Sequence, residues 1–223
     1  MVFYLESFQN LTLLQNLYRL KAMGFEYIDY FNVNEKETFK NATTFYELSS
    51  NITNCHLCDL SKSRKQSMCG YGNTQAKICF VDYSVSQTQD ATNDYFSGRS
   101  GKTLQQMIEN VLQLNTEDIY LTHCIKCKPL NTNKPSQSEW NSCKNHLFTQ
   151  LDFIKPTIIV TLGEEAYAHL TNDTIENFEN VRGHVINYKS MKLIPIYHPQ
   201  FLLRNPELKK TTLNDLLTIK SCL

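Results

Sequence analysis

The sequence predicts an α/β fold in which helices cover both faces of a parallel sheet. Four short apolar runs are separated by segments with helical spacing, as in chains that alternate between strands and helices. Each run is apolar almost throughout, which is typical of parallel strands buried on both faces. The four runs are residues 78–81, 119–122, 158–162 and 193–197.

Helical patterns occupy the segments between and after these runs, at residues 101–114, 138–154, 163–171 and 207–220. Residues 1–50 are predicted to form an N-terminal helical extension, and residues 51–223 the main domain. The extension is inferred from apolar residues that recur at roughly helical spacing, with Gly24 as a stop signal. These residues are Leu11, Leu13, Leu14, Leu17, Leu20 and Met23.

The ends of the four runs indicate where a ligand would bind, because ligands of open parallel sheets lie beyond the carboxyl ends of the strands. Two of the six histidines fall there. Pro195 lies inside the fourth run and predicts an edge strand, since proline cannot donate a hydrogen bond to a neighbouring strand. The four ends are Asp82-Tyr83, Thr122-His123, Gly163-Glu164 and His198-Pro199.

The composition is that of an ordinary globular protein, with 41% hydrophobic and 20% charged residues. The formal net charge is zero, so the total charge does not indicate a nucleic-acid partner. No stretch holds the roughly 18 consecutive apolar residues of a membrane span. The N-terminus lacks the basic start and small-residue cleavage site of a signal peptide, so the expected location is the cytoplasm. We expect a monomer.

Eight cysteines are many for a protein of a reducing compartment, where metal binding explains them better than disulfides. Two CxxC pairs stand out, and Cys143 follows the second pair after fifteen residues. The ligands of a zinc site would be both pairs, Cys55, Cys58, Cys124 and Cys127. The alternative set, Cys55, Cys58, Cys127 and Cys143, would hold an iron–sulfur cluster. The spacing alone does not choose between these sets. Cys69, Cys79 and Cys222 have no paired spacing and are interpreted as small buried apolar residues.

Longer motifs surround these cysteines. A CxxCxLxxxR segment runs from Cys55 to Arg64, Gly70-Tyr71-Gly72-Asn73 leads into the first run, and Lys126-Cys127-Lys128-Pro129 follows the second. An Arg182-Gly183 turn precedes the segment Tyr197–Pro206, which reads YHPQFLLRNP. In this order the motifs resemble those of the family-4 uracil-DNA glycosylases, over roughly residues 55–220.

The resemblance implies a three-layer α/β/α sandwich with a four-stranded parallel sheet. It also implies a 4Fe–4S cluster held by Cys55, Cys58, Cys127 and Cys143, which leaves Cys124 with a structural role. DNA is the implied partner, because enzymes of this superfamily flip a damaged base into a pocket and hydrolyse its N-glycosidic bond.

The resemblance also assigns roles at the site. His198 occupies the place of the histidine that donates to the leaving base, where such donors dominate the rate enhancement. Phe96 corresponds to the aromatic residue that stacks on the base, within Tyr95–Gly101 in place of PFVGxAG. Gly98 lies before a predicted helix and would let backbone amides approach a phosphate. Arg204 follows the His-Pro motif and, with nearby lysines, would contact DNA phosphates.

Two departures from the family bear on catalysis. The segment GEAPGxxED aligns without a gap to Asp82–Asp90, which places Tyr83 at the carboxylate position, and Ser84 is a further candidate for contacting the substrate. Asp82 could supply a carboxylate, but neighbouring residues of a strand point to opposite faces. The second departure is His123, which replaces the asparagine expected to recognise the base edge.

Three hypotheses follow. The first is a DNA glycosylase acting on uracil or a related damaged base, and the second is a glycosylase-like protein that binds DNA without cutting. The third is a zinc protein unrelated to DNA. The orientations of Tyr83 and His123 discriminate between the first two. A His123 that faces the pocket together with a Tyr83 that points away favours catalysis, and a Tyr83 that fills the base site favours binding alone.

Overall fold

The structure is a computed structural model that describes residues 18–19, 21–22, 42–130, 134–173 and 177–223. It divides into two compact units, residues 1–41 and 42–223. In the first unit, Tyr18, Arg19, Lys21 and Ala22 are helical. The leucines and Met23 on which the predicted helix depends lie outside the described residues, so that helix stays a prediction.

The second unit begins at Ala42, earlier than the boundary at residue 51 expected from the sequence. Its first helix, α2 (Phe45–Thr53), packs against the long helix α5 (Gln137–Ile154) and buries Leu48 and Ile52. Residues 42–50 therefore belong to the main domain. No helix among the described residues has the length and apolar character needed to cross a membrane.

A six-stranded sheet with the order β1-β3-β2-β4-β6-β5 forms the centre of this unit. The four inner strands pair in parallel, as predicted, and a short antiparallel strand is added at each edge. The strands are β1 (Tyr71–Gly72), β2 (Ile78–Ser84), β3 (Tyr120–Ile125), β4 (Ile158–Leu162), β5 (Ile186–Tyr188) and β6 (Met191–Ile196).

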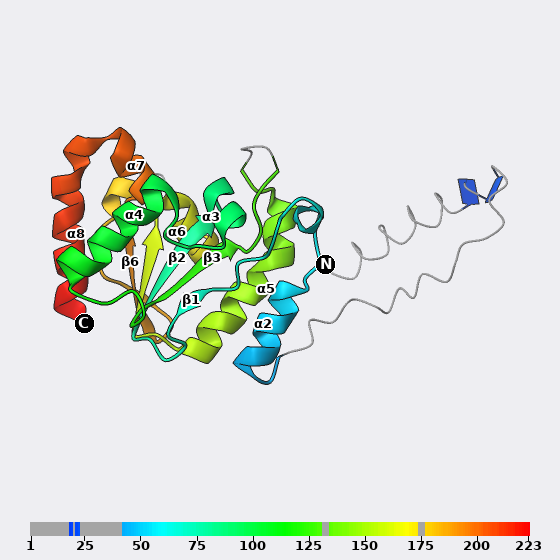
Figure 1. The fold of residues 1–223 in the computed structure, drawn as a ribbon, viewed down its shortest axis with the longest axis horizontal. Helices are drawn as coiled ribbons and strands as arrows, with labels where there is room; N and C mark the ends of the chain where they lie inside the picture. Colours follow the sequence, from blue (N-terminus) through cyan, green and yellow to red (C-terminus); the bar gives the residue numbers. More distant parts are fainter. Residues whose placement is uncertain (1–17, 20, 23–41, 131–133, 174–176) are drawn as a thin grey trace, which may run out of the picture. The chain divides into compact units, whose positions relative to one another are not determined.

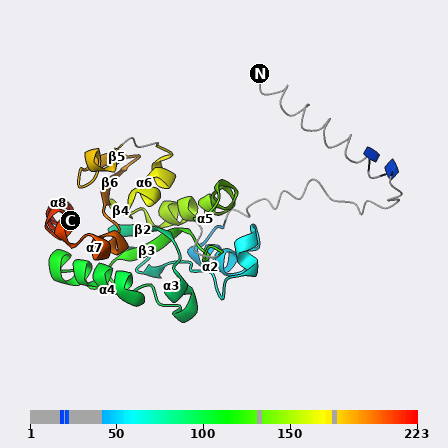
Figure 2. The ribbon, with the colours of Figure 1, turned by 90° about the horizontal axis from the view of Figure 1, so that it is seen from above.

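Helices cover both faces of the sheet, which confirms the expected three layers (Figures 1 and 2). Helices α5 and α6 cover one face, while α4 and α8 lie on the other. The remaining elements are η1 (Asp59–Lys62), α3 (Gln87–Thr92), α4 (Gly98–Gln106), the π-helical η2 (Met107–Leu112), α6 (Glu164–Thr171), η3 (Phe178–Asn180), α7 (Pro199–Arg204), η4 (Pro206–Leu208) and α8 (Lys209–Cys222).

The edge position predicted from Pro195 is wrong, because β6 lies between β4 and β5. The pairing of β5 with β6 extends only to Leu193, opposite Ile186. Beyond it, the carbonyl of Pro195 accepts a hydrogen bond from the Gly183 amide. The carbonyl and nitrogen of a strand residue face the same neighbour. The proline nitrogen therefore faces a side on which the strand pairing has already ended.

Candidate active site and cysteine cavity

The register of β2 and β3 brings together two of the predicted site residues. Asp82 pairs with His123 across the parallel ladder, so both side chains leave the same face of the sheet. The His123 Nε2 atom lies 3.9 Å from Asp82 Oδ2. The sequence analysis placed both residues at the ends of their strands. In the structure they lie within the strands, because β2 continues to Ser84 and β3 to Ile125.

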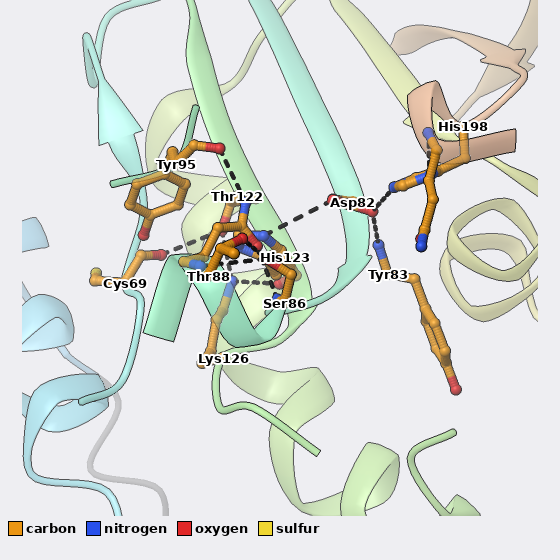
Figure 3. Close-up of polar contacts among 12 residues, drawn as sticks. Cys69, Asp82, Tyr83, Ser86, Thr88, Tyr95, Thr122, His123, Lys126 and His198 are labelled. Carbon is orange, nitrogen blue, oxygen red and sulfur yellow. Dashed lines mark hydrogen bonds and ion pairs between the residues drawn. The ribbon is translucent and has the colours of Figure 1, made fainter. Parts of the chain in front are cut away.

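His198 completes this group from the turn that precedes α7. Its Nε2 lies 3.2 Å from Asp82 Oδ1, and its Nδ1 accepts a hydrogen bond of 3.0 Å from the Gln200 amide. Because Nδ1 accepts, the ring proton of the neutral imidazole lies on Nε2 and points at the carboxylate. Asp82 Oδ1 also accepts from the Tyr83 amide at 2.7 Å, which holds the carboxylate in place (Figure 3).

The electrostatics of Asp82 and His198 are complementary. Burial raises the pKa of the Asp82 carboxyl, but the two neighbouring imidazoles outweigh burial and the net shift of this pKa is downward. Burial lowers the pKa of His198, whereas the charge and hydrogen bond of Asp82 raise it, and the net shift is upward. Asp82 is therefore ionised at neutral pH and directly faces a donor.

His123, which the resemblance places where the family has its base-recognising asparagine, does not line the cleft. Its side chain is fully buried, and the ring of Tyr95 lies 5.4 Å from its own at an angle of 33°. Among the described residues neither ring nitrogen has a hydrogen-bond partner. Burial lowers the pKa of His123 to about 4, so the ring is neutral at pH 7. His123 is therefore a neutral, buried residue beside Tyr95 and is not among the residues that line the cleft.

Tyr83 points away from Asp82 (Figure 3). Its ring stacks on His169 with centroids 5.0 Å apart and planes 4° apart, and its hydroxyl donates to the Pro135 carbonyl at 3.5 Å. Asp82, and not the Tyr83 that the ungapped alignment placed at the carboxylate position, therefore contacts His198. The two side chains diverge because neighbouring residues of a strand point to opposite faces.

The aromatic wall of the site also departs from expectation. Phe96, the predicted stacking residue, packs edge-on against Tyr71 with centroids 5.4 Å apart and is 9% exposed. The adjacent Tyr95 lines the cleft instead. Gly98 begins α4 with a φ of 72°, and a Cβ there would lie 3.0 Å from Thr88 Oγ1. A larger residue at this position would therefore be strained.

A cleft of about 980 Å³ lies in front of Asp82 and His198. Ser84 and Gly98 line it, as the sequence predicted for substrate contacts. Three basic side chains also line it, Arg99 from α4, Lys128 after Cys127 and Arg204 from α7. The same lining includes the carboxylates of Asp82 and Glu165, so the cleft carries charges of both signs.

The four cysteines predicted as cluster ligands line one small cavity, from three separate segments: Cys55 and Cys58 from the loop after α2, Cys127 after β3, and Cys143 on α5. The Arg64 guanidinium donates to the sulfur of Cys127 at 2.8 Å, and the Lys126 amide to that of Cys143 at 3.4 Å. Nitrogen donors of this kind commonly surround thiolate-bound clusters.

Cys124 does not line this cavity, so the structure groups the cysteines as the iron–sulfur set and not as two CxxC pairs. In the part of the chain that the structure describes, no three His, Cys, Asp or Glu side chains are grouped to hold a single metal ion. Burial raises the pKa of the Cys143 thiol to about 12 and also raises that of Cys127. Metal binding would therefore have to displace the thiol protons.

Sequence reasoning assigned no role at the site to three residues of this region, although Lys126 and Gln200 lie within motifs that it named. Gln200 fixes the ring proton of His198 through its backbone amide, which no side-chain motif reveals. Glu165 lines the cleft, and its charge helps to raise the pKa of His198. Lys126 is almost fully buried, although lysines are usually exposed. Only Glu165 had a signal, because it follows the carboxyl end of the third predicted strand.

Comparison with known proteins identifies the family to which this chain belongs. The model of the uracil DNA glycosylase superfamily matches residues 69–217. A type-4 uracil-DNA glycosylase of Saccharolobus solfataricus is 32% identical over 184 residues, covering 79% of this chain and 85% of that protein. Type-4 enzymes of Thermotoga maritima (32% over 177 residues; 78% and 92% covered) and Archaeoglobus fulgidus (34% over 171 residues; 74% and 85%) are similarly related. This chain therefore belongs to the uracil-DNA glycosylase superfamily and is a divergent member of its type-4 family.

Proposed function

We propose that the protein is a DNA-repair glycosylase that removes uracil, or a related damaged base, from DNA by hydrolysis. The contact between Asp82 and His198 carries this proposal, because it places an ionised carboxylate and an N–H donor side by side at the cleft. Relatives that cover most of the chain are named as type-4 uracil-DNA glycosylases, which supports the same reaction.

The two residues suit opposite ends of the bond that breaks. As the N-glycosidic bond lengthens, positive charge develops on the sugar and negative charge on the leaving base. In the structure the Nε2–H of His198 points at Asp82. Once a base is bound, this donor would turn from the carboxylate to the leaving base and stabilise its anion, and the Asp82 carboxylate would stabilise the sugar cation or orient the attacking water. Both groups are held before the substrate arrives, by the amides of Gln200 and Tyr83.

Recognition of the base is assigned to the aromatic wall of the cleft, where Tyr95 lines the cavity and Phe96 and His123 are buried nearby. A flipped base would stack on an aromatic ring of this wall, and stacking contributes about 1–3 kcal/mol per base. His123 can take part only after its surroundings move, since its ring is fully buried, in contact with Tyr95. Ser84 is positioned at the cleft to contact the substrate.

The DNA backbone would lie along the basic side of the cleft. Arg99, Lys128 and Arg204 supply three charges, and the first turn of α4 presents its free amides next to Gly98. Such contacts make binding depend on salt, with affinity falling as the salt concentration rises.

The proposed cofactor is a 4Fe–4S cluster held by Cys55, Cys58, Cys127 and Cys143. The donor set supports it, since four thiols from three segments surround one cavity and nitrogen donors face two of the sulfurs. When bound, the cluster would supply structural cross-linking next to the cleft. It takes no part in the hydrolysis proposed above.

The test is cleavage of a labelled uracil-containing oligonucleotide by anaerobically purified protein. Alkali-labile breaks that disappear in the His198→Ala variant are expected. If cluster-loaded protein shifts DNA in a gel but leaves uracil and a panel of damaged bases intact, the proposed activity is wrong.

A second candidate function is a DNA-binding protein without catalysis. The burial of His123 beside Tyr95 favours it, because the residue that replaces the family's asparagine is fully buried and does not line the cleft. A DNA shift without base release would identify this function.

A further inference from the structure

Lys126 is an unusual lysine, because only 1% of its surface is exposed. It follows the last residue of β3 and precedes Cys127. Its Nζ donates to Thr122 Oγ1 and to the carbonyl of His123, both at 2.6 Å, and to the side-chain oxygen of Gln150. The side chain thus lies along the inner side of the strand that carries His123 (Figure 3).

These three contacts match a charged ammonium group. The carbonyl of His123 and the Gln150 oxygen can only accept hydrogen bonds. The Thr122 hydroxyl has other acceptors for its own proton, the carbonyl of Cys69 and Gln150. An ammonium has three N–H donors, and a neutral amine has only two.

No negative partner accompanies this charge. Among the described residues, the ion pairs include none to Lys126. An uncompensated buried charge is strongly destabilising, so a fold that keeps one normally supplies a counter-charge.

The cysteine cavity is where such a counter-charge would arise. Lys126 lines this cavity, and its backbone amide donates to Cys143 Sγ. Four thiolates around a 4Fe–4S core leave a net negative charge. Arg64 contacts the same cavity from its partly exposed side, through Cys127. Of the two basic residues that line the cavity, Arg64 and Lys126, Lys126 is therefore the buried one.

We propose that Lys126 is the internal counter-charge of the cluster and a positioning residue that links the cluster to the carbonyl of His123. The inference rests on the proposed cofactor and assigns a role that the reaction itself does not require. A filled cluster holds the ammonium in place, and the ammonium holds the strand segment next to Asp82.

The test compares Lys126→Met and Lys126→Gln with wild type and with Lys144→Gln. Methionine is unbranched and apolar, so it fills the space without a charge, and glutamine keeps a polar group there. Lys144→Gln is the matched control, because Lys144 also lies one residue from a cluster cysteine but is partly exposed. Lys126→Arg keeps the charge and should restore most of the wild-type behaviour.

Two readouts are independent of activity. The rate at which a chelator bleaches the absorbance near 400 nm should rise about tenfold or more in both uncharged variants. Their reduction potential should fall, because loss of a nearby positive charge disfavours the more negative reduced cluster. A tenfold change in that equilibrium is about 59 mV for a one-electron couple.

Uncharged variants that keep the cluster at the wild-type rate and potential would overturn the proposal. So would Lys126→Arg behaving like Lys126→Met, since that result would assign the effect to shape. A wild-type protein without absorbance near 400 nm would instead overturn the proposed cofactor, which is a separate failure.

Discussion

Asp82 Oδ1 lies 3.2 Å from His198 Nε2, and this contact joins a residue within strand β2 to the turn between strand β6 and helix α7. The two groups come from opposite ends of the domain sequence. Their meeting depends on the parallel order β2-β4-β6, in which the carboxyl ends of β2 and β6 lie on the same side of the sheet, separated by one strand. The site is thus a consequence of the sheet topology.

Replacing His123 by asparagine restores the residue type expected from the family resemblance. We expect His123→Asn to increase the rate of uracil release by about tenfold or more, because an amide offers the donor and acceptor that suit a base edge. The measurement is single-turnover release from a uracil-containing duplex. An unchanged or lower rate would show that His123 does not limit recognition.

The same residue predicts a pH dependence of stability. The pKa of His123 is about 4 in the folded protein, whereas an exposed histidine titrates near 6.5. The unfolded state therefore binds the extra proton first, and stability falls as the pH drops from above 6.5 to below 4. At about 1.36 kcal/mol per pKa unit, the full loss is about 3 kcal/mol.

Urea unfolding of wild type and His123→Asn at several pH values isolates this contribution. The difference in unfolding free energy between the two proteins should be constant above pH 7 and should shift in favour of the variant below pH 6.5. A difference that stays constant down to pH 4 would contradict the buried, neutral state of His123.

The cysteine set predicts which serine variants lose iron. Serine at Cys55, Cys58, Cys127 or Cys143 should abolish or greatly reduce bound iron, because each removes one thiol from the cavity. Cys124→Ser is the matched control, since Cys124 is buried, as Cys127 and Cys143 are, but lies outside that cavity. Iron and sulfide analysis of purified protein measures the outcome. Iron loss in Cys124→Ser with retention in Cys143→Ser would favour the set of two CxxC pairs.

Gly98 should tolerate no side chain. Gly98→Ala is expected to lower the unfolding free energy by about 1–3 kcal/mol, because φ is 72° and the new Cβ would press on Thr88. Ser100→Ala, two residues later in α4, should change it by less than about 0.5 kcal/mol. Thermal unfolding of both variants provides the comparison, and equal stability would refute the strain.

Much of the fold could be predicted because buried parallel strands leave continuous apolar runs. The runs at residues 78–81 and 158–162 both lie in the centre of the sheet. The edge strands β1 and β5 escaped prediction, since two or three partly exposed residues carry no apolar pattern. The edge position predicted from Pro195 was wrong because its nitrogen faces β5 beyond the last paired residue. Where that pairing stops cannot be read from the sequence.

The site was less predictable, because its geometry depends on strand register and on burial. Asp82 and Tyr83 differ by one position, and only the pairing of Asp82 with His123 shows which of them faces His198. The burial of His123 in contact with Tyr95 arises from packing between segments that are separated in the sequence. By contrast, the cysteine set followed from motifs, whose order and neighbours already distinguished Cys143 from Cys124.

The rate of uracil release by Asp82→Asn, compared with Tyr83→Phe, tests the central claim most directly. Asparagine keeps the size of the side chain but removes its charge, so single-turnover release should fall about 100-fold or more while DNA binding stays intact. Tyr83→Phe should keep a rate close to wild type, because its hydroxyl faces away from the cleft pair. A full rate in Asp82→Asn, or a large loss in Tyr83→Phe, would contradict the assignment of Asp82 as the catalytic carboxylate.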